Sequence, residues 1–151
     1  MKKETGLSYK WIVLIVASVG SLMGPLDSTI VSVSMPSISD ALQMDYAQTL
    51  WVPTAYLVTI ASILLIIGRF SDIFGKKKIY ISGFAIFAVG SLLCSLAQSG
   101  EQLISFRVIQ GIGASFIMTS GTALVSAAFP PGEQGRALGL NVMAVYLGLA
   151  I

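Results

Sequence analysis

Two ionisable side chains lie inside long apolar stretches of the sequence. Asp27 follows an uncharged run that begins at Trp11, and another apolar stretch continues after it. Arg107 lies near the start of an apolar run that reaches Phe129. A charge that faces lipid costs on the order of 3 kcal/mol, so we expect both side chains to face a protein interior or an aqueous cavity. There, a carboxylate and a guanidinium can bind a proton, a cation or each other.

The residues around Arg107 repeat at helical spacing. Spacings of three and four residues place them on one face of a helix. This face is formed by Arg107, Gln110, Gly111, Ala114 and Met118. Polar and small residues on one face favour a cavity or a close helix contact over lipid. Gln110 is therefore a third candidate for the site.

The depths of the two charges in a bilayer can be compared. Asp27 lies sixteen residues after Trp11, which is roughly 24 Å along a helix. Arg107 lies six residues after Glu101, which is roughly 9 Å from the opposite interface. In a hydrocarbon core of about 30 Å, both residues therefore lie in the half of the core nearer to that second interface, at a similar depth. We predict that Asp27 and Arg107 face the same cavity and pair in some states, so that proton binding is coupled to the polarity of the cavity.

Other interpretations of single residues stay open. In one alternative, Asp27 lies at the membrane interface and merely ends the span. In the other, the long side chain of Arg107 extends to the nearby interface. Four further side chains are candidates for lining a site for apolar substrates, although an interfacial belt or core packing also accounts for each of them. They are Trp51, Tyr56, Met118 and Met143.

The composition is that of a membrane protein. Of the 151 residues, 55% are hydrophobic and 11% are charged, whereas soluble domains carry about 25% charged residues. The sequence contains no histidine, and its one cysteine, Cys94, is expected to pack as a small apolar residue. No nucleophile–base pair or metal cluster is visible. We therefore expect no enzyme activity, metal site, cofactor or nucleic-acid partner.

Five apolar segments predict membrane-spanning helices, and hence an all-α membrane protein. Each run is continuous, which favours helices over the alternating strands of a barrel. The spans are expected at about residues 11–38, 46–68, 79–99, 103–129 and 137–151, and the fifth is still apolar at the last residue. The first run also has the basic start of a signal peptide, but its length favours a retained span. Pro25 predicts a kink between Ser21 and Pro25.

The charges in the short connections predict the orientation. Basic residues precede the first span and lie between spans two and three and between spans four and five, whereas the other two connections carry acidic residues. This alternation places residues 1–10 in the cytoplasm and predicts a multi-pass protein of the cytoplasmic membrane.

The connection Gly68–Lys78 carries five charges between two apolar runs. Its pattern resembles the loop between the second and third spans of the major facilitator superfamily. The matching residues are Gly68, Asp72, Gly75, Lys76 and Lys77. Ile73 departs from the family, in which a basic residue is common there. The resemblance implies a conformational loop that latches the two halves of a transporter.

Two more stretches resemble the same family. Leu26–Pro36 is similar to a first-span signature of drug:proton antiporters of the fourteen-span branch, with Ser32 and Ser34 as departures. Leu103–Ala114 is similar to the fourth-span signature of proton-driven facilitators, in which the arginine is linked to proton coupling. Gly111 and Gly113 are in place in that signature, and we expect such glycines to allow close helix packing.

Together these resemblances imply the N-terminal part of a major facilitator helical bundle, with four complete spans and part of a fifth. The parent protein would export amphipathic, often cationic, drugs in exchange for protons by alternating access. Asp27 would bind the proton or cation, and Arg107 would couple protonation to the cavity. Two alternatives remain: a truncated protein that binds or inhibits a full-length relative instead of transporting, and a nutrient facilitator. The missing C-terminal half, or a full-length relative, is a possible partner.

Overall fold

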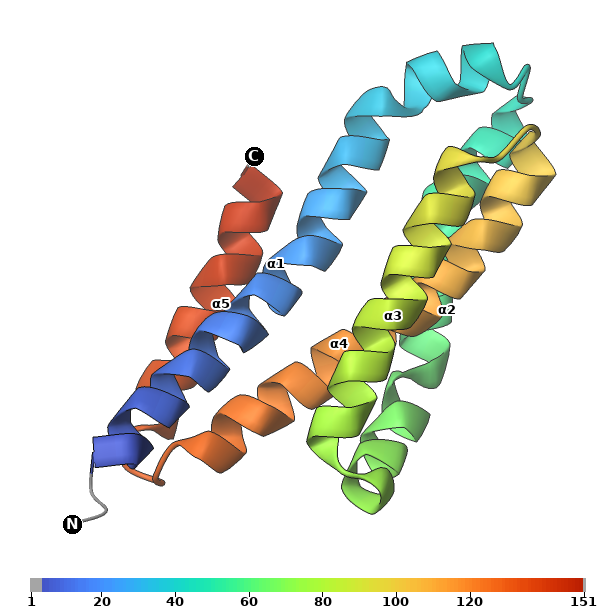
Figure 1. Ribbon diagram of the computed structural model, residues 1–151. Coiled ribbons are helices and arrows are strands. Elements are labelled where there is room, and N and C mark those ends of the chain that lie inside the picture. Colours follow the sequence, from blue (N-terminus) through green and yellow to red (C-terminus); the bar gives the residue numbers. More distant parts are fainter. Residues whose placement is uncertain (1–3, 151) are drawn as a thin grey trace.

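The computed structural model describes residues 4–150 as five helices joined by short connections (Figure 1). The helices are α1 (Glu4–Ala41), α2 (Tyr46–Phe74), α3 (Lys76–Ser95), α4 (Gly100–Ala128) and α5 (Gln134–Ala150). The predicted all-helical fold is confirmed over these residues. The start of the predicted cytoplasmic segment, residues 1–3, and the last residue of the predicted fifth span lie outside the described part.

Four of the helices, α1 to α4, are long and apolar enough to cross a membrane. All four extend past the predicted apolar spans at one or both ends. An apolar run ends where the first charge appears, but a helix backbone satisfies its own hydrogen bonds and continues into polar surroundings. The exposed surface of these helices carries large apolar side chains, as lipid-facing surfaces do.

Side-chain caps set the starts of α2 and α4. Asp45 accepts a hydrogen bond from the backbone N–H of Gln48 at 2.6 Å, and the Gln48 side chain accepts one from the Asp45 N–H at 3.3 Å. Ser99 caps α4 by accepting from the N–H of Gln102 at 3.3 Å. These caps satisfy backbone donors that the first helical turn leaves without partners.

The connection between α2 and α3 is much shorter than the predicted loop. Only Gly75 interrupts the helices, and its φ of +95° is a conformation that side chains disfavour. Gly68 and Asp72 therefore lie on the last turns of α2, and Lys76 and Lys77 lie on the first turn of α3. Asp72 is exposed and forms no ion pair with the side chains of residues 9–150.

Helix α1 continues through both of its prolines, Pro25 and Pro36. The hydroxyl of Thr29 donates to the Pro25 carbonyl at 3.1 Å, one turn along the helix. Figure 1 shows α1 turning aside in its C-terminal part, the part that contains Pro36. Proline removes a backbone hydrogen bond and so allows such bends.

Helix α4 is the centre of the arrangement. It packs against α2 and α3 along one half and runs toward the pair formed by α1 and α5 (Figure 1). The contact with α3 is close because glycines face the partner backbone. A Cβ atom on Gly90 would lie 2.8 Å from the Gln110 Cα atom, and one on Gly113 would lie 2.7 Å from the Phe87 Cα atom. Small residues of this kind let membrane helices approach closely.

Candidate functional site

Asp27 and Arg107 form an ion pair between α1 and α4. The Arg107 Nη1 atom donates to Asp27 Oδ2 at 2.6 Å. The side chain of Arg107 is 2% exposed and that of Asp27 is 18% exposed. The two side chains are therefore turned toward each other, between α1 and α4. A buried guanidinium requires such a partner because an unpaired buried charge is very costly.

Gln110 connects the two charged groups. It lies one turn after Arg107 on α4, and its Oε1 atom accepts from Arg107 Nη1 at 2.5 Å. Its Nε2 atom donates to Asp27 Oδ1 at 2.8 Å. Both carboxylate oxygens of Asp27 therefore accept hydrogen bonds from α4. The three side chains, Asp27, Arg107 and Gln110, form a closed polar network, which we call the α1–α4 network.

Tyr56 of α2 contacts this network through Arg107. The guanidinium carbon of Arg107 lies 4.6 Å from the centre of the Tyr56 ring, at a distance suited to a cation–π interaction. Tyr56 is 2% exposed. Its hydroxyl and the Arg107 Nε atom are both buried without a hydrogen-bond partner among residues 9–150. The hydroxyl points toward α1, because a Cβ atom on Gly24 would lie 3.3 Å from it.

Cys94 of α3 also contacts the α1–α4 network, through Gln110. Its Sγ atom lies 3.8 Å from Gln110 Oε1, within reach of a weak S–H hydrogen bond. The sequence predicts only apolar packing for Cys94, and for Tyr56 only a place among four candidates for lining a substrate site. The signal that was available for Tyr56 is its position in the middle of an apolar run, where a phenol usually needs a polar neighbour.

The other candidate residues lie elsewhere. Trp51, Met118 and Met143 have exposed side chains, so Met118 does not share the buried face of α4 with Arg107 and Gln110. Gly111 faces α2, where a Cβ atom would lie 3.0 Å from the Tyr56 carbonyl oxygen. A polar contact that the sequence did not predict joins α1 to α5: the Ser21 hydroxyl donates to Asn141 Oδ1 at 3.1 Å.

The α1–α4 network can exist in two charge states. With Asp27 ionised, its attraction to Arg107 holds α1 against α4 in a low-dielectric interior. A proton on Asp27 removes that attraction and leaves Arg107 with hydrogen bonds alone. A cationic ligand near Asp27 would compete with Arg107 in the same way. The contact between α1 and α4 at this point therefore depends on the charges of Asp27 and Arg107.

Comparison with known proteins identifies the family. Residues 17–151 match the Major Facilitator Superfamily. The chain belongs to this superfamily. Major facilitators are transporters rather than enzymes, as the sequence analysis predicted. With four membrane-spanning helices, the chain is a multi-pass membrane protein.

Relatives within the superfamily include drug-resistance and export proteins. The chain is 40% identical over 147 residues to the methylenomycin A resistance protein of Bacillus subtilis, which covers 97% of the chain and 30% of the relative. It is 38% identical over 142 residues to the riboflavin transporter RibZ of Clostridioides difficile, covering 94% and 31%. It is 35% identical over 130 residues to the tetracenomycin C resistance and export protein of Streptomyces glaucescens, covering 86% and 24%. The chain thus spans about a third, or less, of the length of these major facilitators.

Proposed function

We propose that this chain is part of a proton-coupled drug exporter of the fourteen-span branch of the major facilitators, with its N-terminus in the cytoplasm and its helices in the cytoplasmic membrane. The observation that carries the proposal is the buried α1–α4 network. An intramembrane carboxylate paired with an arginine marks a substrate or ion pathway more often than a structural contact. The names of the resistance and export relatives support drugs as the substrate class.

In this proposal Asp27 exchanges its partner during transport. Ionised Asp27 binds Arg107 and Gln110, or a cationic amphipathic substrate that displaces Arg107. Protonation of Asp27 releases the substrate, and Arg107 then keeps its contacts with Gln110 and the Tyr56 ring. The residues at the α2–α3 connection, Gly68 to Lys77, would limit how the helices move against a second half of the transporter.

A chimeric transporter tests the proposal. Residues 1–151 would replace the aligned segment of the methylenomycin A resistance protein, and cells would be assayed for methylenomycin resistance and for efflux of a cationic dye. We expect the chimera to export the dye, and an ionophore that collapses the proton gradient to stop it. Asp27→Asn should abolish efflux, whereas the matched control Asp40→Asn, at the exposed end of the same helix, should not.

Two results would contradict this proposal. Efflux that persists after Asp27→Asn would show that export does not need the carboxylate. Efflux that the ionophore does not change would show that export is not coupled to protons. Uptake of riboflavin by the chimera, without drug export, would instead favour a nutrient facilitator, which the relation to the riboflavin transporter supports.

A non-transporting role, in which the chain binds or inhibits a full-length relative, is the second candidate. In that case residues 1–151 expressed alone should lower the resistance conferred by a co-expressed full-length relative. A chain that alone restores dye efflux would exclude this role.

A further inference from the structure

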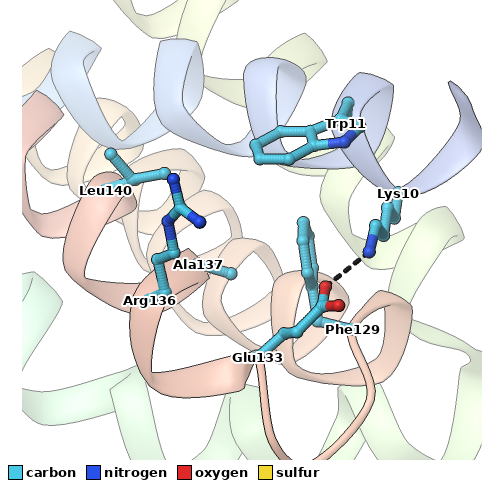
Figure 2. Close-up of a pocket in the computed structure, with 7 residues that line it drawn as sticks. All are labelled: Lys10, Trp11, Phe129, Glu133, Arg136, Ala137 and Leu140. Atoms are coloured by element: carbon cyan, nitrogen blue, oxygen red, sulfur yellow. Dashed lines mark hydrogen bonds and ion pairs between the residues drawn. The ribbon is translucent and has the colours of Figure 1, made fainter. Parts of the chain in front are cut away.

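A second polar site lies at the other end of α1, far from the α1–α4 network. Lys10 precedes Asp27 by seventeen residues, which is roughly 25 Å along the helix. Here a pocket of about 240 Å³ opens between the start of α1, the end of α4 and the start of α5 (Figure 2). Its lining residues are Lys10, Trp11, Phe129, Glu133, Arg136, Ala137 and Leu140.

The cationic side of this pocket is fixed in place. The side chain of Lys10 is 13% exposed and forms an ion pair with Glu133, which is 51% exposed. The Lys10 ammonium also lies 5.3 Å from the centre of the Phe129 ring, and Trp11 packs its ring edge-to-face with Phe129 at 5.8 Å. The Glu133 carboxylate and the Phe129 ring therefore hold the ammonium, and Trp11 packs against that ring.

The connection that completes the pocket is also fixed. The side-chain amide of Gln134 donates to the carbonyl of Ser126 at 2.8 Å and to that of Phe129 at 3.2 Å. These bonds tie the first residue of α5 to the last turn of α4 and satisfy carbonyl groups that the helix end leaves without partners. The pocket therefore does not depend on a loose loop for its shape.

The charges in the pocket do not balance. Lys10 and Glu133 neutralise each other, and Arg136, which is exposed, forms no ion pair with the side chains of residues 9–150. Figure 2 shows Arg136 and Lys10 on opposite sides of the pocket, with Leu140 beside Arg136. An anionic group between the two cations would be next to an apolar wall, so the site fits a ligand that joins a phosphate to hydrocarbon.

We propose that this pocket binds an anionic glycerophospholipid. The phosphodiester lies between Arg136 and Lys10, and the first acyl carbons contact Leu140 and Trp11. Glu133 competes with the phosphodiester for Lys10, so the carboxylate lowers the affinity of the site. The proposal requires that this end of the bundle lies at a membrane interface, but it does not require transport or proton coupling.

The fluorescence of Trp11 tests the proposal directly. The chain contains two tryptophans, so Trp51→Phe leaves Trp11 as the reporter inside the pocket. The full chain would be placed in phosphatidylcholine bilayers that contain either brominated phosphatidylglycerol or brominated phosphatidylcholine, since bromine quenches only a tryptophan in contact with it. We expect brominated phosphatidylglycerol to bind next to Trp11 about fivefold more strongly than brominated phosphatidylcholine, as expected for one unpaired cation near a membrane surface.

Variants of the pocket should change this preference in opposite directions. Arg136→Gln should bring the ratio close to one, whereas Glu133→Gln should raise it by freeing Lys10. The matched control is Arg69→Gln, which removes an exposed arginine near the end of α2, outside the pocket. It should leave the ratio unchanged. Because Glu133→Gln is expected to strengthen binding, misfolding of a variant cannot imitate the complete pattern.

Several results would overturn the proposal. These are equal quenching by the two lipids in the Trp51→Phe protein, an equal loss in Arg69→Gln and Arg136→Gln, or weaker binding in Glu133→Gln. Millimolar inorganic phosphate that removes the preference would show that a free anion occupies the pocket. Stronger quenching by brominated phosphatidylethanolamine than by phosphatidylglycerol would show that a zwitterionic headgroup does.

Discussion

Arg107 is a guanidinium inside a bundle of apolar helices, and its neighbours explain how it is tolerated. Asp27 supplies the opposite charge, Gln110 supplies a hydrogen-bond acceptor, and the ring of Tyr56 covers one face. Each compensates part of the cost of removing the charge from water. The arginine therefore depends on α1, α2 and α4 together, and a change in any of them alters its surroundings.

Tyr56 and Tyr80 are both buried, and they should respond differently to loss of the hydroxyl. Because the Tyr56 hydroxyl has no partner within the described chain, Tyr56→Phe should change the free energy of unfolding by less than about 0.5 kcal/mol. Tyr56→Leu removes the ring under the guanidinium and should cost about 2 kcal/mol or more. Unfolding in mixed micelles would measure both.

Tyr80→Phe is the control for this pair of variants. The Tyr80 hydroxyl donates to the Val16 carbonyl at 2.7 Å, so its removal should cost about 1 kcal/mol. If Tyr56→Phe destabilised the protein as much as Tyr56→Leu, the ring would not be the part of Tyr56 that supports Arg107.

At the scale of single residues, the sequence predicted that Asp27 and Arg107 lie together, but not which residues of α2 and α3 contact the α1–α4 network. Asp27 and Arg107 are rare charges in apolar runs, and Gln110 follows Arg107 at helical spacing, so all three are visible without a structure. Tyr56 and Cys94 are not, because each lies in an apolar run where a packing role is equally compatible with the sequence. Only the contact between helices reveals that both adjoin Gln110 or Arg107.

At the scale of the helices, α3 and α4 approach closely because glycines replace side chains at their contact. A Cβ atom on Gly113 would collide with the backbone nitrogen and Cα atom of Phe87, and a backbone cannot rotate away as a side chain can. Gly113→Ala should therefore separate the two helices and cost about 1–3 kcal/mol. The same unfolding measurement in mixed micelles checks this.

Gly139 on α5 provides the control for Gly113→Ala. A Cβ atom there would meet no atom within 4 Å, so Gly139→Ala should leave stability unchanged or raise it by about 1 kcal/mol through better helix propensity. Equal effects of the two substitutions would mean that the α3–α4 contact is not limited by its glycines.

Helix ends were harder to predict than helices. The apolar runs identified all five elements, but the predicted connection at Gly68–Lys78 proved to be helical except at Gly75. The charges of this connection suggested a loop. Arg69 and Asp72 are nevertheless compatible with a helix where α2 has left the hydrocarbon region. The turn lies at Gly75, whose φ is positive, whereas Gly68 lies within α2.

At the scale of the whole molecule, the alternation of charges across the connections carries the proposed orientation. The α4–α5 connection lies at the same end as the start of α1, and the α3–α4 connection lies at the opposite end (Figure 1). In a Cys94→Ser background, a membrane-impermeant thiol reagent should label Gln98→Cys on intact cells. It should label Gly132→Cys only after the membrane is permeabilised.

Both positions are exposed in the structure, so a difference in labelling reports the side of the membrane rather than burial. The reverse pattern would place the N-terminus outside the cell. It would also place the lipid site at Lys10 and Arg136 in the outer leaflet.

The claim on which the account depends is that Asp27 and Arg107 contact each other inside the bundle, and a double-mutant cycle of unfolding free energies tests it most directly. Asp27→Asn and Arg107→Met should each cost about 3 kcal/mol, because each leaves a partner without its opposite charge. The double variant should cost about 2 kcal/mol less than the sum of the two single variants, since residues in direct contact couple. Costs that add to within about 0.5 kcal/mol would mean that the two side chains do not interact, and would contradict the account.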